Sequence, residues 1–201
     1  MHPNPLFAWK NESEMRAFSA ERGFGLLCVA AQGMIITASV PFVWLNEGRI
    51  GFHVARSNPI RDQLEGAQVV LCVQGTDSYI SPDWYGIDDQ VPTWNYVMVE
   101  IRGSVAAMSQ AKLVELLDRL SDEFEARLAP KKVWKREKMT PDRFDAMLGA
   151  IEGFELAVAM MQGVRKLSQN KAAPVRATLV EALKCAGDES MAALVGATLA
   201  K

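Results

Sequence analysis

The stretch Gln74–Tyr96, QGTDSYISPDWYGIDDQVPTWNY, is the part of the sequence from which the fold can be argued. It holds two of the five tryptophans, Trp84 and Trp94, and all three tyrosines, and it mixes them with Ser81, Asn95 and two prolines. A core strand does not need this mixture. Rings beside hydrogen-bonding side chains and rigid prolines favour a site that holds a flat ligand by stacking and hydrogen bonds. Protein–protein interfaces are enriched in the same rings, so interface packing is the alternative interpretation.

Composition limits the function classes. The chain has 201 residues, of which 49% are hydrophobic, enough for one substantial domain or for one domain with a helical appendage. A net charge of −2 excludes a strong general attraction to nucleic acid. No apolar run approaches the length of a membrane span, and we expect no membrane contact. Two histidines and three scattered cysteines provide no zinc spacing, so no metal site is expected. The odd cysteine count, without a signal peptide, favours a reducing cytoplasm.

Hydrophobic patterning predicts mostly antiparallel strands. Short apolar or alternating runs are separated by turn residues, and several of them form hairpins. The expected strands cover residues 24–31, 34–40, 42–45, 49–55, 67–73, 93–105 and 154–160. Periodicity alone therefore predicts only an α+β protein with antiparallel strands. The hairpin connections, with helices inserted late in the chain, favour an antiparallel barrel.

Helical spacing appears mainly outside these strands. The longest expected helix runs from Ser109 to about Ala129, and its inward face comprises Leu113, Leu116, Leu117, Leu120, Phe124 and Leu128. A shorter helix is expected to begin at Asn58-Pro59 and another at Thr140-Pro141. From Pro174 the sequence becomes rich in alanine. We therefore expect one domain over residues 1–170 and a helical appendage over residues 171–201.

Four motifs, in order, resemble one known family. They are GFHVARSNP at 51–59, YISPDWYG followed by VPTWNY at 79–96, GFE at 153–155 and KLSQN at 166–170. Together they are similar to the PaiB family of FMN-binding split-barrel proteins, which are described as negative transcriptional regulators. The resemblance implies a six-stranded antiparallel split β-barrel with added helices. It also implies FMN held at a homodimer interface, with DNA as a partner on the strength of the resemblance alone.

The sequence departs from the family at three places. Residues 38–41 read ASVP and residues 75–81 read GTDSYIS, so two family histidines are replaced. Ile60 and Arg61 follow Asn58-Pro59, so the tryptophan that the family has soon after Asn-Pro is missing. A dimeric family member that has lost flavin is therefore one alternative.

The FMN phosphate needs fixed positive charge and small hydrogen-bond donors. Arg56 and Ser57 offer both, at a strand end just before Asn58. Lys166 and Ser168 form a second pair of a cation and a hydroxyl. We expect the phosphate between Arg56 and Lys166. The alternative is that both cations belong to an ordinary solvated surface.

The flavin ring needs stacking partners and groups that read its pyrimidine edge. Trp84 and Trp94 are expected to stack, and three amides are expected to read the edge. Because His53 lies on the strand face opposite Ile50, Phe52 and Val54, it is interpreted as lining the cofactor, although single histidines are more often structural. The expected cofactor-binding residues outside the phosphate pairs are His53, Asn58, Tyr79, Ser81, Trp84, Trp94, Asn95, Gln169 and Asn170.

Three functions remain in competition. The first is a flavin-binding regulatory dimer, the second a flavin-dependent oxidoreductase for a small molecule, and the third the dimer without flavin. No dinucleotide-binding glycine motif, phosphate-binding loop or nucleophile elbow is present, so no catalytic residue is assigned. We expect a binding protein rather than an enzyme.

Overall fold

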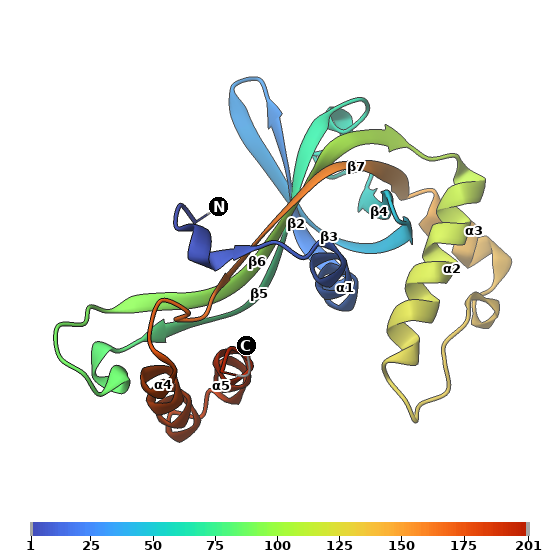
Figure 1. The fold of residues 1–201 in the computed structure, drawn as a ribbon. Coiled ribbons are helices and arrows are strands. Elements are labelled where there is room, and N and C mark those ends of the chain that lie inside the picture. The colour runs from blue at the N-terminus through green and yellow to red at the C-terminus, as the bar shows by residue number, and fades with distance from the viewer. Residues whose placement is uncertain (1, 200–201) are drawn as a thin grey trace. The chain divides into compact units, whose positions relative to one another are not determined.

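The computed structural model describes residues 2–199. Its contacts divide the chain into two compact units. We call residues 16–73 and 100–161 the barrel unit, and residues 1–15, 74–99 and 162–201 the terminal unit. The strands are β1 (Ala8–Trp9), β2 (Phe24–Ala31), β3 (Met34–Asn46), β4 (Arg49–Ala55), β5 (Gln68–Ile80), β6 (Thr93–Ala107) and β7 (Ile151–Lys166). The α-helices are α1 (Glu12–Arg22), α2 (Gln110–Ala126), α3 (Pro141–Leu148), α4 (Ala173–Cys185) and α5 (Glu189–Gly196) (Figure 1).

Six strands close into a ring in the barrel unit. Their order is β7-β4-β3-β2-β5-β6, and β6 returns to β7. The pairs β2–β3, β2–β5, β3–β4 and β4–β7 are antiparallel. The predicted antiparallel α+β fold is therefore confirmed. Strands β5, β6 and β7 continue from the barrel unit into the terminal unit.

Side-chain alternation builds the core of the ring. In β4, Ile50, Phe52 and Val54 are buried, and Phe52 stacks on Phe154 of β7 with 5.7 Å between ring centroids. Each such side chain contributes about 1.5–3 kcal/mol when fully removed from water. Because successive side chains of a strand point to opposite faces, His53 lies on the other face of β4.

Helix α2 packs on the outer face of the ring. Its residues Leu113, Leu116 and Leu120 are buried in one cluster with Val43 of β3. A Cβ added to Gly51 of β4 would lie 2.7 Å from Leu116 Cδ1, so a larger residue here would force the Leu116 side chain to shift. In Figure 1, α3 runs beside α2. The predicted leucine face is confirmed for these three residues.

Three members of that predicted face differ. Leu117 and Phe124 are only partly buried, and Leu128 lies beyond the end of α2 with 54% of its surface exposed. The helix ends at Ala126 because the chain turns there, with Arg127 N–H bonded to the Phe124 carbonyl at 3.3 Å.

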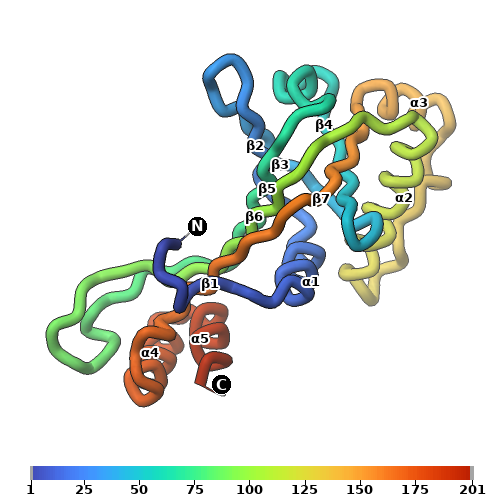
Figure 2. The backbone as a smooth tube through the Cα atoms, turned by 45° about the horizontal axis from the view of Figure 1, so that its top comes forward, coloured from blue at the N-terminus to red at the C-terminus, as the bar shows by residue number. Residues whose placement is uncertain are grey.

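The terminal unit combines a short strand pair with two helices. Strand β1 pairs with the end of β7, Ala8 opposite Val164 and Trp9 opposite Gly163 (Figure 2). Helices α4 and α5 lie side by side, and Asp188 caps α5 by accepting from Met191 N–H at 3.0 Å. None of the helices within residues 2–199 combines the length and the apolar character that a bilayer crossing requires.

Several boundaries differ from the sequence-based prediction. Strand β3 is continuous through Pro41, and β5 extends to Ile80, where a loop was expected from Gln74. In place of the expected α-helix after Asn58, the chain forms a single 3-10 turn at Arg61–Gln63. Asn58 Oδ1 accepts from Ile60 N–H at 3.1 Å, so the side chain stabilises a tight turn rather than a helix start. The expected domain boundary at residue 170 stays a prediction.

Candidate functional site

A polar cavity of about 260 Å³ lies within the terminal unit. We call it the lysine cavity. Its walls come from the N-terminal segment, the 3-10 turn η3 (Pro82–Tyr85), β6 and the segment that follows β7. The lining residues are His2, Asn4, Phe7, Tyr85, Val91, Thr93, Asn95, Lys166, Ser168, Asn170 and Lys171.

Ser168 forms the buried centre of this cavity. Its hydroxyl lies 3.0 Å from Tyr85 Oη and accepts from Asn95 Nδ2 at 3.1 Å. Asn95 is fully buried and Ser168 is 2% exposed, so these polar groups satisfy one another rather than water. Ser168 adopts φ 61°, in the left-handed region that a serine rarely occupies. The hydrogen bonds of the Ser168 hydroxyl therefore stabilise a backbone turn at the wall of the cavity.

Two lysines bring positive charge to the cavity. Lys166 donates to Thr93 Oγ1 at 2.5 Å, and burial lowers the pKa of its ammonium from the ordinary value of 10.5. Lys171 Nζ donates to Gln90 Oε1 and lies 5.1 Å from the centre of the Tyr85 ring. Neither lysine pairs with a carboxylate in these contacts, and no Asp or Glu is among the described residues of the lining.

The side chains of Gln169 and Asn170, which follow Ser168, make different contacts. Gln169 accepts from Leu167 N–H at 2.7 Å and donates to the Arg165 carbonyl, so its amide serves the local backbone. Asn170 lines the lysine cavity and is exposed. The structure thus brings Asn95, Lys166, Ser168 and Asn170 of the predicted set together, and directs Gln169 elsewhere.

Aromatic residues of the same unit form a separate surface. The rings of Tyr79 and Trp94 meet edge to face at 5.9 Å, and both residues are about half exposed. Ser81 and Trp84 follow on η3 and are partly buried. These exposed rings can stack on a ligand or pack on another chain.

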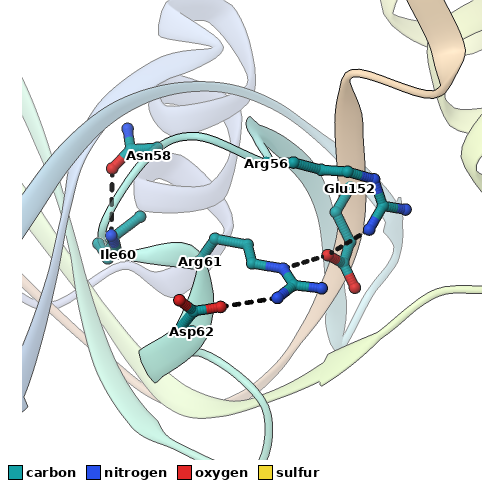
Figure 3. A network of polar contacts seen from close by, with 6 residues as sticks. All are labelled: Arg56, Asn58, Ile60, Arg61, Asp62 and Glu152. Atoms are coloured by element: carbon teal, nitrogen blue, oxygen red, sulfur yellow. Dashed lines mark hydrogen bonds and ion pairs between the residues drawn. The ribbon is translucent and has the colours of Figure 1, made fainter.

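The predicted Arg56 pair belongs to the barrel unit and lies in an ion-pair network (Figure 3). Arg56 bonds to Glu152 at 3.1 Å, and Arg61 bonds to the same carboxylate at 2.5 Å and to Asp62 at 2.6 Å. Two guanidinium groups thus meet two carboxylates, and the network is balanced in charge. Ser57 lies exposed at the turn that leads to Asn58.

His53 also belongs to the barrel unit. Its side chain lines a second cavity with residues of α2, α3 and the chain between them. Burial lowers the pKa of the imidazole from its ordinary value of 6.5, so it is neutral near pH 7. Within the described residues, no group of three or more metal-binding side chains is found.

Seven lining residues of the lysine cavity were not predicted, and three of them, Tyr85, Thr93 and Lys171, make the polar or ring contacts described above. Each of these three lies within or next to a quoted motif, since Tyr85 and Thr93 belong to the aromatic stretch and Lys171 follows KLSQN directly. The signal was therefore present in the sequence, but their common contact with one cavity depends on the tertiary fold.

The chain is similar to known proteins over most of its length. Residues 1–160 match the family model described as "Putative FMN-binding domain". The chain is 30% identical over 175 residues to the protease synthase and sporulation protein PAI 2 of Bacillus subtilis, which covers 85% of this chain and 83% of that protein.

Two solved structures share the fold. The FAD and heme binding protein of Mycobacterium smegmatis aligns with a TM-score of 0.59 at 15% identity, over 85% of this chain and 78% of that one. The flavocytochrome Anf3 of Azotobacter vinelandii aligns with a TM-score of 0.59 at 16% identity, over 82% and 72%. The predicted split-barrel fold is therefore confirmed.

Proposed function

The chain belongs to the FMN-binding family that its first 160 residues match, and we propose that it is a dimeric flavin-binding regulatory protein which holds the FMN phosphate in the lysine cavity. FMN is its cofactor, as the description of the matching family model supports. When bound, FMN supplies redox chemistry that protein side chains lack. The residues of this chain supply binding and orientation.

The single observation that carries the proposal is the donor set of the lysine cavity. A phosphate dianion is best held by ammonium groups and by hydroxyl or amide donors, in a place without competing carboxylates. Lys166 and Lys171 supply the charge, Ser168 and Thr93 the hydroxyls, and Asn170 an amide. Since burial lowers the pKa of Lys166, a bound anion would also relieve the cost of keeping its charge partly out of water.

The flavin ring is proposed to use the aromatic surface of the same unit. Trp94 and Tyr79 present exposed rings, and Trp84 follows on η3. Stacking of a flat ring on such side chains contributes about 0.5–1.5 kcal/mol beyond the area that is buried. The expected contributions of Asn58, Ser81, Asn95 and Gln169 to cofactor binding stay predictions.

A homodimer is proposed because large apolar side chains stand exposed in both units. In the terminal unit, Trp94 is 54% and Val91 74% exposed; in the barrel unit, Met34 and Ile35 are each 66% exposed. Patches of this kind mark interaction surfaces. Light scattering at micromolar concentration is expected to give about twice 22.1 kDa. A monomer across that range would contradict the dimer.

A regulatory role is proposed over an enzymatic one because the Bacillus subtilis relative is named for protease synthesis and sporulation. DNA is a possible partner through that resemblance, and the cytoplasm is the expected location. The solved flavoproteins named above share only the fold with this chain, so they favour no particular reaction.

One experiment separates the three candidate functions. Purified protein is mixed with FMN, freed of unbound flavin and examined by its visible spectrum, then supplied with reduced nicotinamide nucleotide. We expect retained flavin absorbance and no sustained nucleotide oxidation. Loss of all flavin would favour the dimer without cofactor, and steady oxidation would favour the oxidoreductase.

A further inference from the structure

A second cavity, of about 270 Å³, lies within the barrel unit and has a different chemical character. We call it the histidine cavity. It is bounded by β4, α2, the chain between α2 and α3, α3 itself and the first residue of β7. The lining residues are His53, Leu117, Asp118, Ser121, Trp134, Arg136, Met139, Phe144, Met147, Leu148 and Ile151.

The charged groups at this cavity neutralise each other. Arg136 donates to both carboxylate oxygens of Asp118, from Nε at 3.0 Å and from a terminal nitrogen at 3.1 Å. The same guanidinium lies 5.0 Å from the centre of the Phe144 ring. A planar two-point pair that is also covered by a ring has little left to offer an incoming anion. The cavity therefore does not favour a phosphate or a carboxylate.

The imidazole of His53 is the polar group that lacks a partner. Its Nδ1 is buried and makes no hydrogen bond within the part of the chain that the structure describes. Burial also keeps the ring neutral near pH 7, so it has one nitrogen that donates and one that accepts. A hydroxyl that enters the cavity can bond to the nitrogen that the ring presents there, because a neutral imidazole can both donate and accept.

The remaining wall is largely apolar. Trp134 and Phe144 provide rings, and Leu148 and Ile151 provide branched aliphatic surface. Met139 has a flexible thioether side chain that can move to admit a guest without a shift of the backbone. An apolar wall with a few polar groups is the usual character of a small-molecule site.

From these contacts we propose that the histidine cavity binds an uncharged aromatic molecule that carries one hydroxyl group, with the ring against Trp134 and Phe144 and the hydroxyl bonded to His53. The inference is independent of the proposed flavin site, which lies in the other unit. It gives His53 a ligand other than FMN. The sequence-based expectation places FMN beside His53, whereas this inference predicts that FMN does not compete with the aromatic molecule there.

The probes are phenol and benzene, which have the same ring and differ by one hydroxyl. The chain has two histidines, so the imidazole Cε1 signals in a carbon–proton NMR spectrum can be assigned with His53→Leu. Phenol is expected to shift the His53 signal and to leave the His2 signal in place. It should bind about threefold to tenfold more tightly than benzene, the effect of one neutral hydrogen bond.

Two variants sharpen the test. His53→Leu should bring the ratio of phenol to benzene affinity close to one, and Met139→Trp, which fills the cavity, should weaken both probes. If His53→Leu does not fold, the shift in the wild type and the preference for phenol decide the matter. The inference is overturned if phenol leaves the His53 signal unmoved, if benzene binds as tightly as phenol, or if added FMN displaces phenol.

Discussion

The lysine cavity and the histidine cavity have nearly the same volume, about 260 and 270 Å³, and opposite chemistry. The first combines two ammonium groups with hydroxyl and amide donors and has no carboxylate among its described lining residues. The second has an apolar wall, one charge-neutral ion pair and one unpartnered imidazole. The size of a cavity therefore says little about its ligand. The sign of the charge and the unsatisfied polar atoms decide between a flavin phosphate and an uncharged ring.

The two cavities also arise from different kinds of sequence. The lysine cavity is built largely by short segments whose residues stand close together in the chain, such as Lys166, Ser168 and Lys171. The histidine cavity is built by amphipathic helices inserted between β6 and β7, where apolar side chains on one face must cover the barrel. Clustered polar residues in a short segment predict a binding site directly, whereas the apolar face of an amphipathic helix predicts only that this face is buried.

The largest expected effect concerns helix α2, in which Leu116 belongs to the core and Leu117 lines the histidine cavity. Leu116→Ala should lower the free energy of unfolding by about 2–5 kcal/mol, because Leu116 is 2% exposed and fills space above Gly51. Leu117→Ala should cost clearly less, because Leu117 is partly buried and already faces a cavity. Urea unfolding of both variants measures the difference. Equal losses would show that the cavity is closed in solution.

The next effect concerns the buried centre of the lysine cavity. Asn95→Ala removes a partner of the Ser168 hydroxyl in a place that water does not reach, and should lower the free energy of unfolding by about 1–3 kcal/mol. Asn170→Ala, at an exposed position of the same lining, is the matched control and should change it by less than about 0.5 kcal/mol. A loss in Asn95→Ala as small as in the control would refute the role given to Asn95.

A smaller effect concerns pH and His53. Because burial lowers its pKa in the folded state, the unfolded chain binds a proton at His53 before the folded chain does. Stability is therefore lost as the pH falls below about 6.5, the ordinary value for histidine. His53→Leu should lose less stability than the wild type between pH 7.5 and pH 5 in parallel denaturant titrations. Identical pH profiles would mean that His53 titrates alike in the folded and unfolded chains.

The smallest expected effect is the pH dependence of FMN binding through Lys166. Because the pKa of Lys166 lies below the ordinary 10.5, the affinity for FMN should begin to fall at a lower pH than it would if an exposed lysine held the phosphate. Riboflavin has the same ring and no phosphate, so its affinity should not share that part of the decline. Fluorescence titrations of both flavins between pH 8 and pH 10 make the comparison. Parallel curves would remove Lys166 from the phosphate site.

Much of the fold could be predicted from local patterns. Alternation in residues 49–55 and the helical spacing of Leu113, Leu116 and Leu120 predicted the strand and the helix that the structure has. The two-residue strand β1 was missed, because its pairing with Gly163 and Val164 depends on residues more than 150 positions away. The extension of β5 to Ile80 was missed because the polar residues after Gln74 are typical of a loop.

The candidate site was predictable only in part. Lys166, Ser168 and Asn170 were identified from one motif, and the structure places all three at one cavity. Arg56 was identified by the same reasoning, but nothing near it in the sequence indicates Glu152, which lies 96 residues further along the chain and bonds to it. Opposite charges that meet through the fold cannot be paired from composition. The role of Arg56 toward FMN therefore stays a prediction.

The measurement that tests the central claim most directly is the affinity ratio of FMN to riboflavin in four proteins: wild type, Lys166→Met, Arg56→Ala and the exposed control Lys10→Met. Wild type and Lys10→Met should prefer FMN strongly. Lys166→Met keeps the aliphatic stem and removes the charge, so it should lower FMN affinity about tenfold or more and leave riboflavin nearly unchanged. A parallel loss in Arg56→Ala would add Arg56 to the phosphate contacts. If Lys166→Met keeps the full preference for FMN, the phosphate does not lie in the lysine cavity and the account is wrong.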